Sequence, residues 1–499
     1  MAYAYDGLGR ISRRTVNAGS TGVATTYGYL AGGHGTNSTT PLVQTITQSG
    51  TTLTYAYDDA GNITSVSDGS KTISYEYDLL GQLIRANDPY DTTAGTTGTT
   101  WKYAYDLGGN IQSKTAYAFT TGSVGAAVKT NTYSYGDSNW KDKLTAFNGN
   151  AISYDEIGNP LNDGTWSYTW AKGRQLQSMS RSGEAVTFVY NSDGLRVQKI
   201  ATSTGTTKYS MHGRNLVHLT NGSDSLHFFY DAQNKPAIVE FNGAAYAYLY
   251  NQQDNIIGLV DNAGVQVVSY SYDAWGQIIN TTGSLANTLG KLNPFKYRGY
   301  IYDEETGLYY LRSRYYNPDL CRFINADDVE SMGADGDING YQLFIYCMND
   351  PVNLKDEAGS WSLPNWAKIA ISAAIIIGAA VVATVATGGV ACIAAGAAIG
   401  AANGAVSGAV GGAITGAIQS RIEPGSWDNA LEAAVDGAVD GFLGGAVSGF
   451  IIGGITSKFC FVAGTLIHTE DGLVPIEEIK PDQLVWAEDP ETGERALKR

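Results

Sequence analysis

The side chains that most often carry metal or redox chemistry are few in this chain and widely spaced. There are four cysteines, and no two of them form a C-x-x-C pair: Cys321, Cys347, Cys392 and Cys460. This spacing predicts neither a disulfide scaffold nor a zinc site, so we expect the first three simply to be buried. Asp335 to Gly340 imitates the first half of a calcium loop, but Tyr346 stands where the bidentate Glu belongs. No metal and no cofactor is expected.

Arginine and tyrosine, which bind anions and stack on rings, are concentrated between residues 294 and 327. The chain changes character on either side of this stretch. A repetitive strand-like array precedes it, and a charge-free Gly/Ala region follows. We interpret the stretch as the seal between a container and its contents.

The length and the composition of the chain limit the classes of function that it can have. A chain of 499 residues with 33 Tyr, 61 Gly and 16% charged residues suggests about three folded units, not a disordered protein. The net charge of -16 argues against a nucleic-acid-binding surface over the whole chain. The start MAYAYDGLGR lacks a secretory signal and lies inside a repeat, which suggests a piece of a longer protein.

Residues 1–290 repeat one unit about every twenty residues, an alternating strand followed by Tyr-Asp, two residues and Gly. The clear copies begin at Tyr5-Asp6, Tyr57-Asp58, Tyr77-Asp78, Tyr105-Asp106, Tyr154-Asp155 and Tyr272-Asp273, with weaker ones at Tyr190-Asn191 and Tyr250-Asn251. Alternation predicts strands, Asp starts a turn, and Gly supplies a positive φ. Each unit is therefore expected to be a β-hairpin, with its Tyr and Asp serving architecture and not catalysis.

This pattern resembles the RHS or YD-repeat family. The resemblance implies a mainly β fold, in which hairpins coil into a hollow β-shell that holds a polypeptide. The alternative is an adhesin whose aromatic residues bind carbohydrate.

Residues 291–360 resemble the RHS-associated core domain, which would close the shell. Its R-Y-Y-D-P-x-x-G-R-F string is matched by RYYNPDLCRF at 314–323. Further matches are YRGY at 297–300 and the segment from Asn339 to Asn353.

In toxin-type members this domain resembles an aspartyl self-protease, and motif positions assign its parts to Arg314, Asp327 and Asp356. Two carboxylates in a dry site share a proton, so one acts as base towards water while the other donates to the carbonyl oxygen. The resemblance places the cut at Gly359-Ser360 or Ser360-Trp361. The alternative is that Arg314 and Asp327 form a structural ion pair in an inert plug.

Residues 361–457 are rich in Gly and Ala, and no charge occurs from 369 to 419. Such a run is long enough for a membrane span. Glu432, Asp436 and Asp440 lie four residues apart, on one face of an expected helix. Two alternatives stay open, a segment that inserts into a target-cell membrane and a helical packet held inside the shell.

Residues 458–499 resemble the start of a Hint domain, an intein-like autoprocessing fold of all-β type. In that family a leading cysteine, here Cys460, attacks the carbonyl of the preceding residue, here Phe459. The later block with the activating histidine is missing, so no Hint chemistry is predicted from these residues alone. His468 is expected to be an ordinary strand residue.

Together these resemblances predict part of a bacterial polymorphic toxin, secreted or displayed on the cell surface. Its cargo would be the chain's own C-terminal toxin region, and its partners would include a cognate immunity protein but no nucleic acid.

Overall fold

The computed structural model describes residues 1–18, 22–32, 38–327, 342–356, 359, 362–364, 466–469, 472–475, 485–488 and 495–498. The chain divides into two compact units, Met1–Asn365 and Trp366–Arg499. The predicted membrane-active or packed segment 369–419 and the acidic positions 432, 436 and 440 lie outside the described residues. Among the residues described, no helix has both the length and the apolar character needed to cross a membrane.

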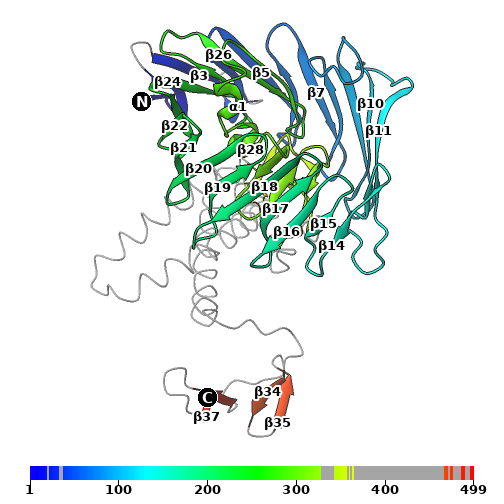
Figure 1. Cartoon of the computed structure of the whole chain (residues 1–499). Coiled ribbons are helices and arrows are strands. Elements are labelled where there is room, and N and C mark those ends of the chain that lie inside the picture. The colour runs from blue at the N-terminus through cyan, green and yellow to red at the C-terminus, as the bar shows by residue number, and fades with distance from the viewer. Residues whose placement is uncertain are drawn as a thin grey trace, which may run out of the picture. The chain divides into compact units, whose positions relative to one another are not determined.

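The first unit is dominated by two long antiparallel sheets of 13 and 14 strands, in which every strand pairs with its neighbours in sequence (Figure 1). The first sheet contains β1 (Ala2–Tyr5), β2 (Ile11–Asn17), β3 (Gly22–Ala31), β4 (Thr39–Gln48), β5 (Thr51–Tyr57), β6 (Ile63–Ser67), β7 (Thr72–Tyr77), β8 (Leu83–Asp88), β9 (Thr99–Tyr105), β10 (Ile111–Ala118), β11 (Ala127–Ser134), β12 (Ala146–Phe147) and β13 (Asn150–Ala151).

The second sheet continues the same pattern. It contains β14 (Ser153–Tyr154), β15 (Pro160–Asn162), β16 (Ser167–Ala171), β17 (Gln175–Arg181), β18 (Glu184–Tyr190), β19 (Arg196–Ala201), β20 (Gly205–His212), β21 (Asn215–Asn221), β22 (Asp224–Tyr230), β23 (Pro236–Phe241), β24 (Ala244–Tyr250), β25 (Ile256–Val260), β26 (Gln266–Tyr272) and β27 (Ile278–Thr282). Strictly sequential pairing is what a chain of stacked hairpins produces.

The Tyr-Asp turns form as their sequence predicts, and the turn at Asp78 shows how. The Oδ1 atom of Asp78 accepts the backbone N–H groups of Leu80 and Gln82, each at 2.9 Å, and its Oδ2 atom accepts the Gln82 side-chain amide at 2.9 Å. Gly81 has a φ of +76°, a conformation that favours glycine. The carboxylate therefore satisfies the amides of the turn that the strands cannot reach.

The repeat tyrosines join one hairpin to the next. The Tyr77 hydroxyl donates to the carbonyl of Ile63, the first residue of β6, at 2.7 Å. Equivalent bonds run from Tyr57 to Val43, Tyr105 to Leu83, Tyr190 to Leu176, Tyr230 to Leu216, Tyr250 to Pro236 and Tyr272 to Ile256. Each tyrosine thus ties its own hairpin to the preceding one, which explains why the residue recurs with the turn.

Strands from the start of the first sheet pack against late strands of the second. Val16 and Val23 share a buried cluster with Ala247 and Leu249, and Figure 1 draws β3 beside β24. The Gln48 amide donates to the Tyr250 carbonyl at 2.6 Å, which fixes this contact between residues 202 positions apart.

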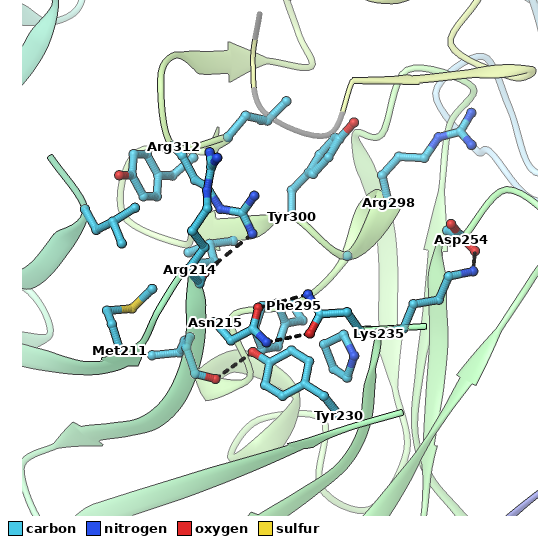
Figure 2. A pocket seen from close by; sticks show the side chains of 18 of the residues that line it. Met211, Arg214, Asn215, Tyr230, Lys235, Asp254, Phe295, Arg298, Tyr300 and Arg312 are labelled. Carbon is cyan, nitrogen blue, oxygen red and sulfur yellow. Dashed lines mark hydrogen bonds and ion pairs between the residues drawn. The ribbon is translucent and has the colours of Figure 1, made fainter. Parts of the chain in front are cut away.

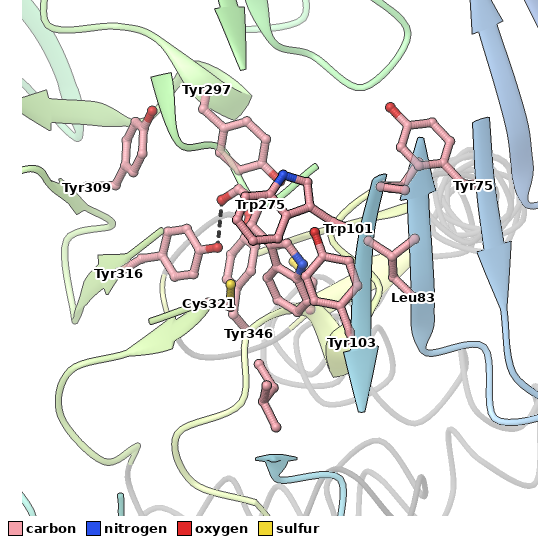
Figure 3. Close-up of a cluster of buried hydrophobic side chains, with 14 of the residues drawn as sticks. Tyr75, Leu83, Trp101, Tyr103, Trp275, Tyr297, Tyr309, Tyr316, Cys321 and Tyr346 are labelled. Carbon is pink, nitrogen blue, oxygen red and sulfur yellow. Dashed lines mark hydrogen bonds between the residues drawn. The ribbon is translucent and has the colours of Figure 1, made fainter. Parts of the chain in front are cut away.

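The segment after β27 packs its aromatic rings against both sheets. It forms α1 (Leu289–Leu292), a 3₁₀ turn (Tyr297–Gly299), the small sheet β28 (Ile301–Asp303), β29 (Leu308–Tyr310), β30 (Tyr315–Asn317) and β31 (Arg322–Phe323), a second 3₁₀ turn (Cys347–Asn349), and the hairpin β32 (Leu354–Asp356) and β33 (Ser362–Pro364). Its tyrosines meet Trp101, Tyr103 and Trp275 in the largest buried cluster (Figure 3). The Tyr316 and Tyr346 rings stack with centroids 3.9 Å apart.

The described part of the second unit is a four-stranded antiparallel sheet. Its strands are β34 (Leu466–Thr469), β35 (Gly472–Pro475), β36 (Val485–Glu488) and β37 (Arg495–Lys498), in the order β35-β34-β36-β37. His468 lies on β34, which agrees with its expected place on a strand.

Candidate functional site

Arg314 is a buried cation held between three elements of the first unit. It directly precedes β30, whereas Asp327 lies shortly after β31 and Asp356 is the last residue of β32. The Arg314 Nη2 atom lies 2.9 Å from Asp327 Oδ2 and 3.6 Å from Asp356 Oδ2. The side chains of Arg314, Asp327 and Asp356 are only 5%, 14% and 1% exposed. Residues 42 positions apart in the sequence therefore meet around one guanidinium group.

The same guanidinium also contacts the backbone of the predicted cleavage segment. Its Nε atom donates to the Gly359 carbonyl, and its Nη1 atom donates to the Leu343 carbonyl at 3.0 Å. The Phe323 ring lies beneath it, 3.6 Å from ring centroid to guanidinium carbon. These contacts use the planar fork of arginine in full and fix its orientation.

Asp356 holds the other side of the Gly359 peptide. The Gly359 backbone N–H donates to Asp356 Oδ1 at 2.6 Å, so this short loop is clamped through both its N–H and its C=O. Gly359 is buried and has a φ of +78°. A Cβ atom there would lie 2.7 Å from Ser313 Oγ and 3.1 Å from the backbone nitrogen of Arg314. An L side chain at this position would be strained by the positive φ and would force Ser313 or the Arg314 backbone to shift.

The pKa of Arg314 lies below its ordinary value, because burial lowers it by more than the charges of Asp327 and Asp356 raise it. Arginine stays protonated in proteins, so the site contains one permanent cation between two carboxyl groups. Such an arrangement can stabilise negative charge that develops on a carbonyl oxygen nearby.

Two tyrosines that sequence reasoning did not single out support Asp356. The Asp356 N–H donates to the Tyr300 hydroxyl at 3.1 Å, and that hydroxyl also bonds the Tyr346 hydroxyl at 3.2 Å. Both rings are buried in the aromatic cluster. Tyr300 ends the YRGY motif and so carried a signal, but no spacing rule connects it with Asp356.

The remaining predicted site residues, Ser360, Trp361, Phe459 and Cys460, lie outside the described residues. The chain is described again at β33, where Ser362 pairs with Asp356 in an antiparallel register. The predicted cut therefore falls, in the sequence, between two paired strands, the first of which ends in a predicted catalytic residue.

No group of three or more His, Cys, Asp or Glu side chains within the described ranges is arranged to hold a metal ion. Cys321 and Cys347 are both buried, whereas Cys392 and the calcium-like segment 335–340 are not among the described residues.

A family model described as the teneurin YD-shell matches residues 66–352, more than half of the chain. The chain belongs to this YD-shell family. Among curated relatives, it is 34% identical over 330 residues to the tRNA3(Ser)-specific nuclease WapA of Bacillus spizizenii, covering 64% of this chain and 11% of that protein. The tRNA nuclease WapA of Bacillus subtilis is 35% identical over 229 residues, covering 45% of this chain and 10% of that protein.

Solved toxin structures share the fold. A crystal structure of TcdB2-TccC3-Cdc42 superimposes with a TM-score of 0.57 and 18% identity over 72% of this YD-shell chain and 19% of the other. The Photorhabdus luminescens Tc holotoxin pore gives a TM-score of 0.55 at 17% identity, covering 72% of this chain and 19% of that one. This YD-shell chain spans about a tenth of the length of the WapA relatives.

Proposed function

We propose that this YD-shell chain encloses a C-terminal toxin region and releases it by cutting its own backbone after the core segment. The supporting observation is the clamp on Gly359, in which Arg314 bonds the carbonyl, Asp356 bonds the N–H, and Asp327 pairs with the same arginine. A structural ion pair would not require the same guanidinium to bind the backbone carbonyl of the predicted cleavage segment.

The proposed reaction is hydrolysis of one peptide bond. One carboxylate takes a proton from water, and the resulting hydroxide adds to the carbonyl carbon. The other, protonated carboxyl group stabilises the carbonyl oxygen with Arg314. As the C–N bond breaks, the leaving nitrogen takes the proton that the first carboxylate removed from water. The Gly359-Ser360 bond is favoured over Ser360-Trp361 because the Gly359 carbonyl is the one that accepts from Arg314.

Mass spectrometry of the purified chain tests the proposal. We expect a fragment that ends at Gly359, and no cleavage in Asp327→Asn or Asp356→Asn. Asp319→Asn is the matched control, because Asp319 is an exposed carboxylate of the same segment. A fragment that ends at Ser360 would move the cut by one bond. A chain that stays intact and binds glycans would favour the adhesin instead.

The family resemblance also supports a role for the core domain, the Hint module and an immunity protein. Residues 291–360 act as the core domain, and 458–499 are the first part of a Hint module headed by Cys460. In a longer chain, thiol-induced cleavage between Phe459 and Cys460 would reveal that module. The released toxin is neutralised by an immunity protein in the producing bacterium, which secretes the shell or displays it on its surface.

A further inference from the structure

The first turns of the second sheet contact the backbone directly before Asp327. One is the Tyr-Asp turn between β14 and β15, which contains Gly158, and the other lies between β16 and β17 and contains Arg174. The two turns are tied together, because the Asn159 side-chain amide donates to the Gly173 carbonyl at 2.8 Å. They therefore form one support, at the place in the chain where the first sheet ends and the second begins.

These turns hold the backbone of Ala326 through both of its polar groups. The Ala326 N–H donates to the Gly158 carbonyl at 3.2 Å, and the Ala326 carbonyl accepts from Arg174 Nη1 at 2.7 Å. Arg174 Nη1 also donates to the Ile157 carbonyl at 3.0 Å, so one group joins the turn to the core segment, residues 291–360. Because the fully buried Ala326 directly precedes Asp327, these bonds fix the peptide from which the Asp327 side chain extends.

The other half of that peptide is held within the core segment. The Asp327 N–H donates to the Leu343 carbonyl at 2.8 Å, and the same carbonyl accepts from Arg314. Leu343 is in turn held by the repeat region, since its N–H donates to Asp142 Oδ2 at 2.8 Å. The peptide before Asp327 is thus bound at both its C=O and its N–H, which restricts how the carboxylate can approach Arg314.

Packing leaves little room for this contact to shift. Gly158 has a φ of +86°, and a Cβ atom there would lie 2.7 Å from the Trp140 ring and 2.8 Å from Ala326 Cβ. Gly61 occupies the same turn position in an earlier repeat, with a φ of +87°, and a Cβ atom there would meet nothing within 4 Å. The close approach is therefore specific to the repeat that contacts the core segment.

The core segment also meets repeat turns away from this support. Arg312 Nη2 donates to the Arg214 carbonyl at 3.5 Å, and Figure 2 shows the two residues beside each other. That contact does not involve the peptide before Asp327. Among the described residues of the repeat region, the bonds to Ala326 come from the turns at Gly158 and Arg174.

We propose that Arg174 is a positioning residue for self-cleavage, through which the folded repeat region places the Asp327 carboxylate against Arg314. This inference rests on the proposed self-cleavage and adds a condition to it, because the cut then depends on the hairpins that carry Gly158 and Arg174 being folded. The bonds of Arg174 go to two backbone carbonyls, so it acts through the position of Asp327. Errors of about 1 Å in such a position can slow a reaction roughly 100-fold.

The rate of self-cleavage, followed as the fraction of intact full chain over time, tests this role. Arg174→Gln should slow cleavage about 10- to 100-fold. Arg174→Lys keeps one cationic donor for the Ala326 carbonyl and should recover part of the rate. Arg85→Gln is the matched control, because Arg85 also donates to two carbonyls of the repeat region, at 2.7 Å each, and its loss should leave the rate unchanged. Thermal melts establish that each variant is folded.

A second pair of variants changes the support without removing a charge. Gly158→Ala should slow cleavage to a similar extent, since the new Cβ atom would displace Ala326, whereas Gly61→Ala should cleave like the parent chain. Equal rates for the two glycine variants, or equal rates for Arg174→Gln and Arg85→Gln, would overturn the proposal.

Hydrogen exchange separates this inference from the proposed cleavage. In an Asp356→Asn background, which is expected to stay intact, Arg174→Gln should speed exchange of the Ala326 and Asp327 amide hydrogens about tenfold, and Arg85→Gln should not. A parent chain that is never cut overturns both the cleavage and the part of Arg174 in it. A parent chain that is cut, together with unchanged exchange in Arg174→Gln, overturns the positioning role alone.

Discussion

Arg314 forms ion pairs with two carboxyl groups and donates hydrogen bonds to two carbonyls. Lysine would keep the charge but not the planar fork that reaches all four. Gly359 is equally sensitive to a small change, because one added Cβ atom would contact Ser313 and the Arg314 backbone. Two substitutions, one at each residue, test whether these contacts control cleavage.

Replacing Arg314 by Lys should slow self-cleavage about 100-fold or more, because the Gly359 carbonyl loses its donor. The rate is measured as the fraction of intact chain over time after purification. Arg312→Lys, a neighbouring arginine outside the clamp, should leave the rate unchanged. A rate for Arg314→Lys equal to that of the parent chain would exclude Arg314 as the stabilising donor.

Replacing Gly359 by Ala should also slow cleavage, because the new Cβ atom would lie 2.7 Å from Ser313 Oγ. Gly81→Ala controls for backbone strain, since Gly81 has a φ of +76° and a Cβ atom there would meet nothing within 4 Å. Both variants carry a strain of about 1 kcal/mol or more. Only Gly359→Ala is expected to change the cleavage rate, so equal rates for the two variants would count against the clamp.

At the scale of elements, the repeat hairpin depends on its Asp and Tyr in different ways. The carboxylate closes the turn within one hairpin, whereas the hydroxyl reaches the hairpin before it. The copies at Asn191 and Asn251 keep the Oδ1 contact to the turn amides, which is why a Tyr-Asn pair folds in the same way.

The turn can be tested at Asp78. Asp78→Ala should lower the free energy of unfolding by about 1–3 kcal/mol, since two backbone N–H groups lose their acceptor. Asp78→Asn retains an oxygen at that position and should cost less. Denaturant titration measures both values, and an equal loss in the two variants would contradict the turn-closing role.

The link between hairpins can be tested at Tyr77. Tyr77→Phe removes the bond to the Ile63 carbonyl while keeping the ring, so the expected loss is about 0.5–1.5 kcal/mol. Tyr5→Phe is the control because the Tyr5 side chain is 60% exposed. If the two variants were equally stable, the hydroxyl would not contribute to stacking.

For the whole first unit, buried carboxyl groups should make stability depend on pH in two opposite ways. Burial raises the pKa of Asp88 and of Asp350 to about 7. Below the ordinary pKa of Asp, both carboxyl groups are protonated and their burial does not lower the stability of the fold. This stability is lost as the pH rises towards 7, because the folded protein holds the two protons more tightly than the unfolded chain does. At Asp254 and Asp303 the opposite holds, because the cations Lys235 and Arg196 outweigh desolvation and lower the pKa of these two carboxyl groups. The stability that the two ionised carboxylates contribute is lost as the pH falls into the acid range.

We therefore expect the melting temperature to pass through a maximum between these ranges and to fall from about pH 5 to pH 8. Asp88→Asn should flatten that fall, because the neutral amide has no proton to lose. Melting temperatures across this pH range provide the measurement. A variant whose pH dependence equals that of the parent chain would show that Asp88 does not contribute.

Local sequence by itself determined the hairpins of the YD-shell. Alternating residues, an Asp at the turn and a Gly with positive φ act over fewer than ten positions, so their outcome could be predicted without the remaining fold. It also indicated Arg314, Asp327 and Asp356 through family motifs. Their catalytic role stays a prediction, as do the roles of Cys460 and of residues 369–419.

Only the tertiary structure decided what those residues contact. It brought Asp327 and Asp356 within ion-pair distance of one guanidinium, which also binds the Gly359 carbonyl. It also connected Asp356 to the hydroxyl of Tyr300, which bonds that of Tyr346. It further bonded the first turns of the second sheet to the core segment. The reason is physical: these contacts join residues tens to more than a hundred positions apart, and their geometry follows from how the long sheets pack, which no local pattern encodes.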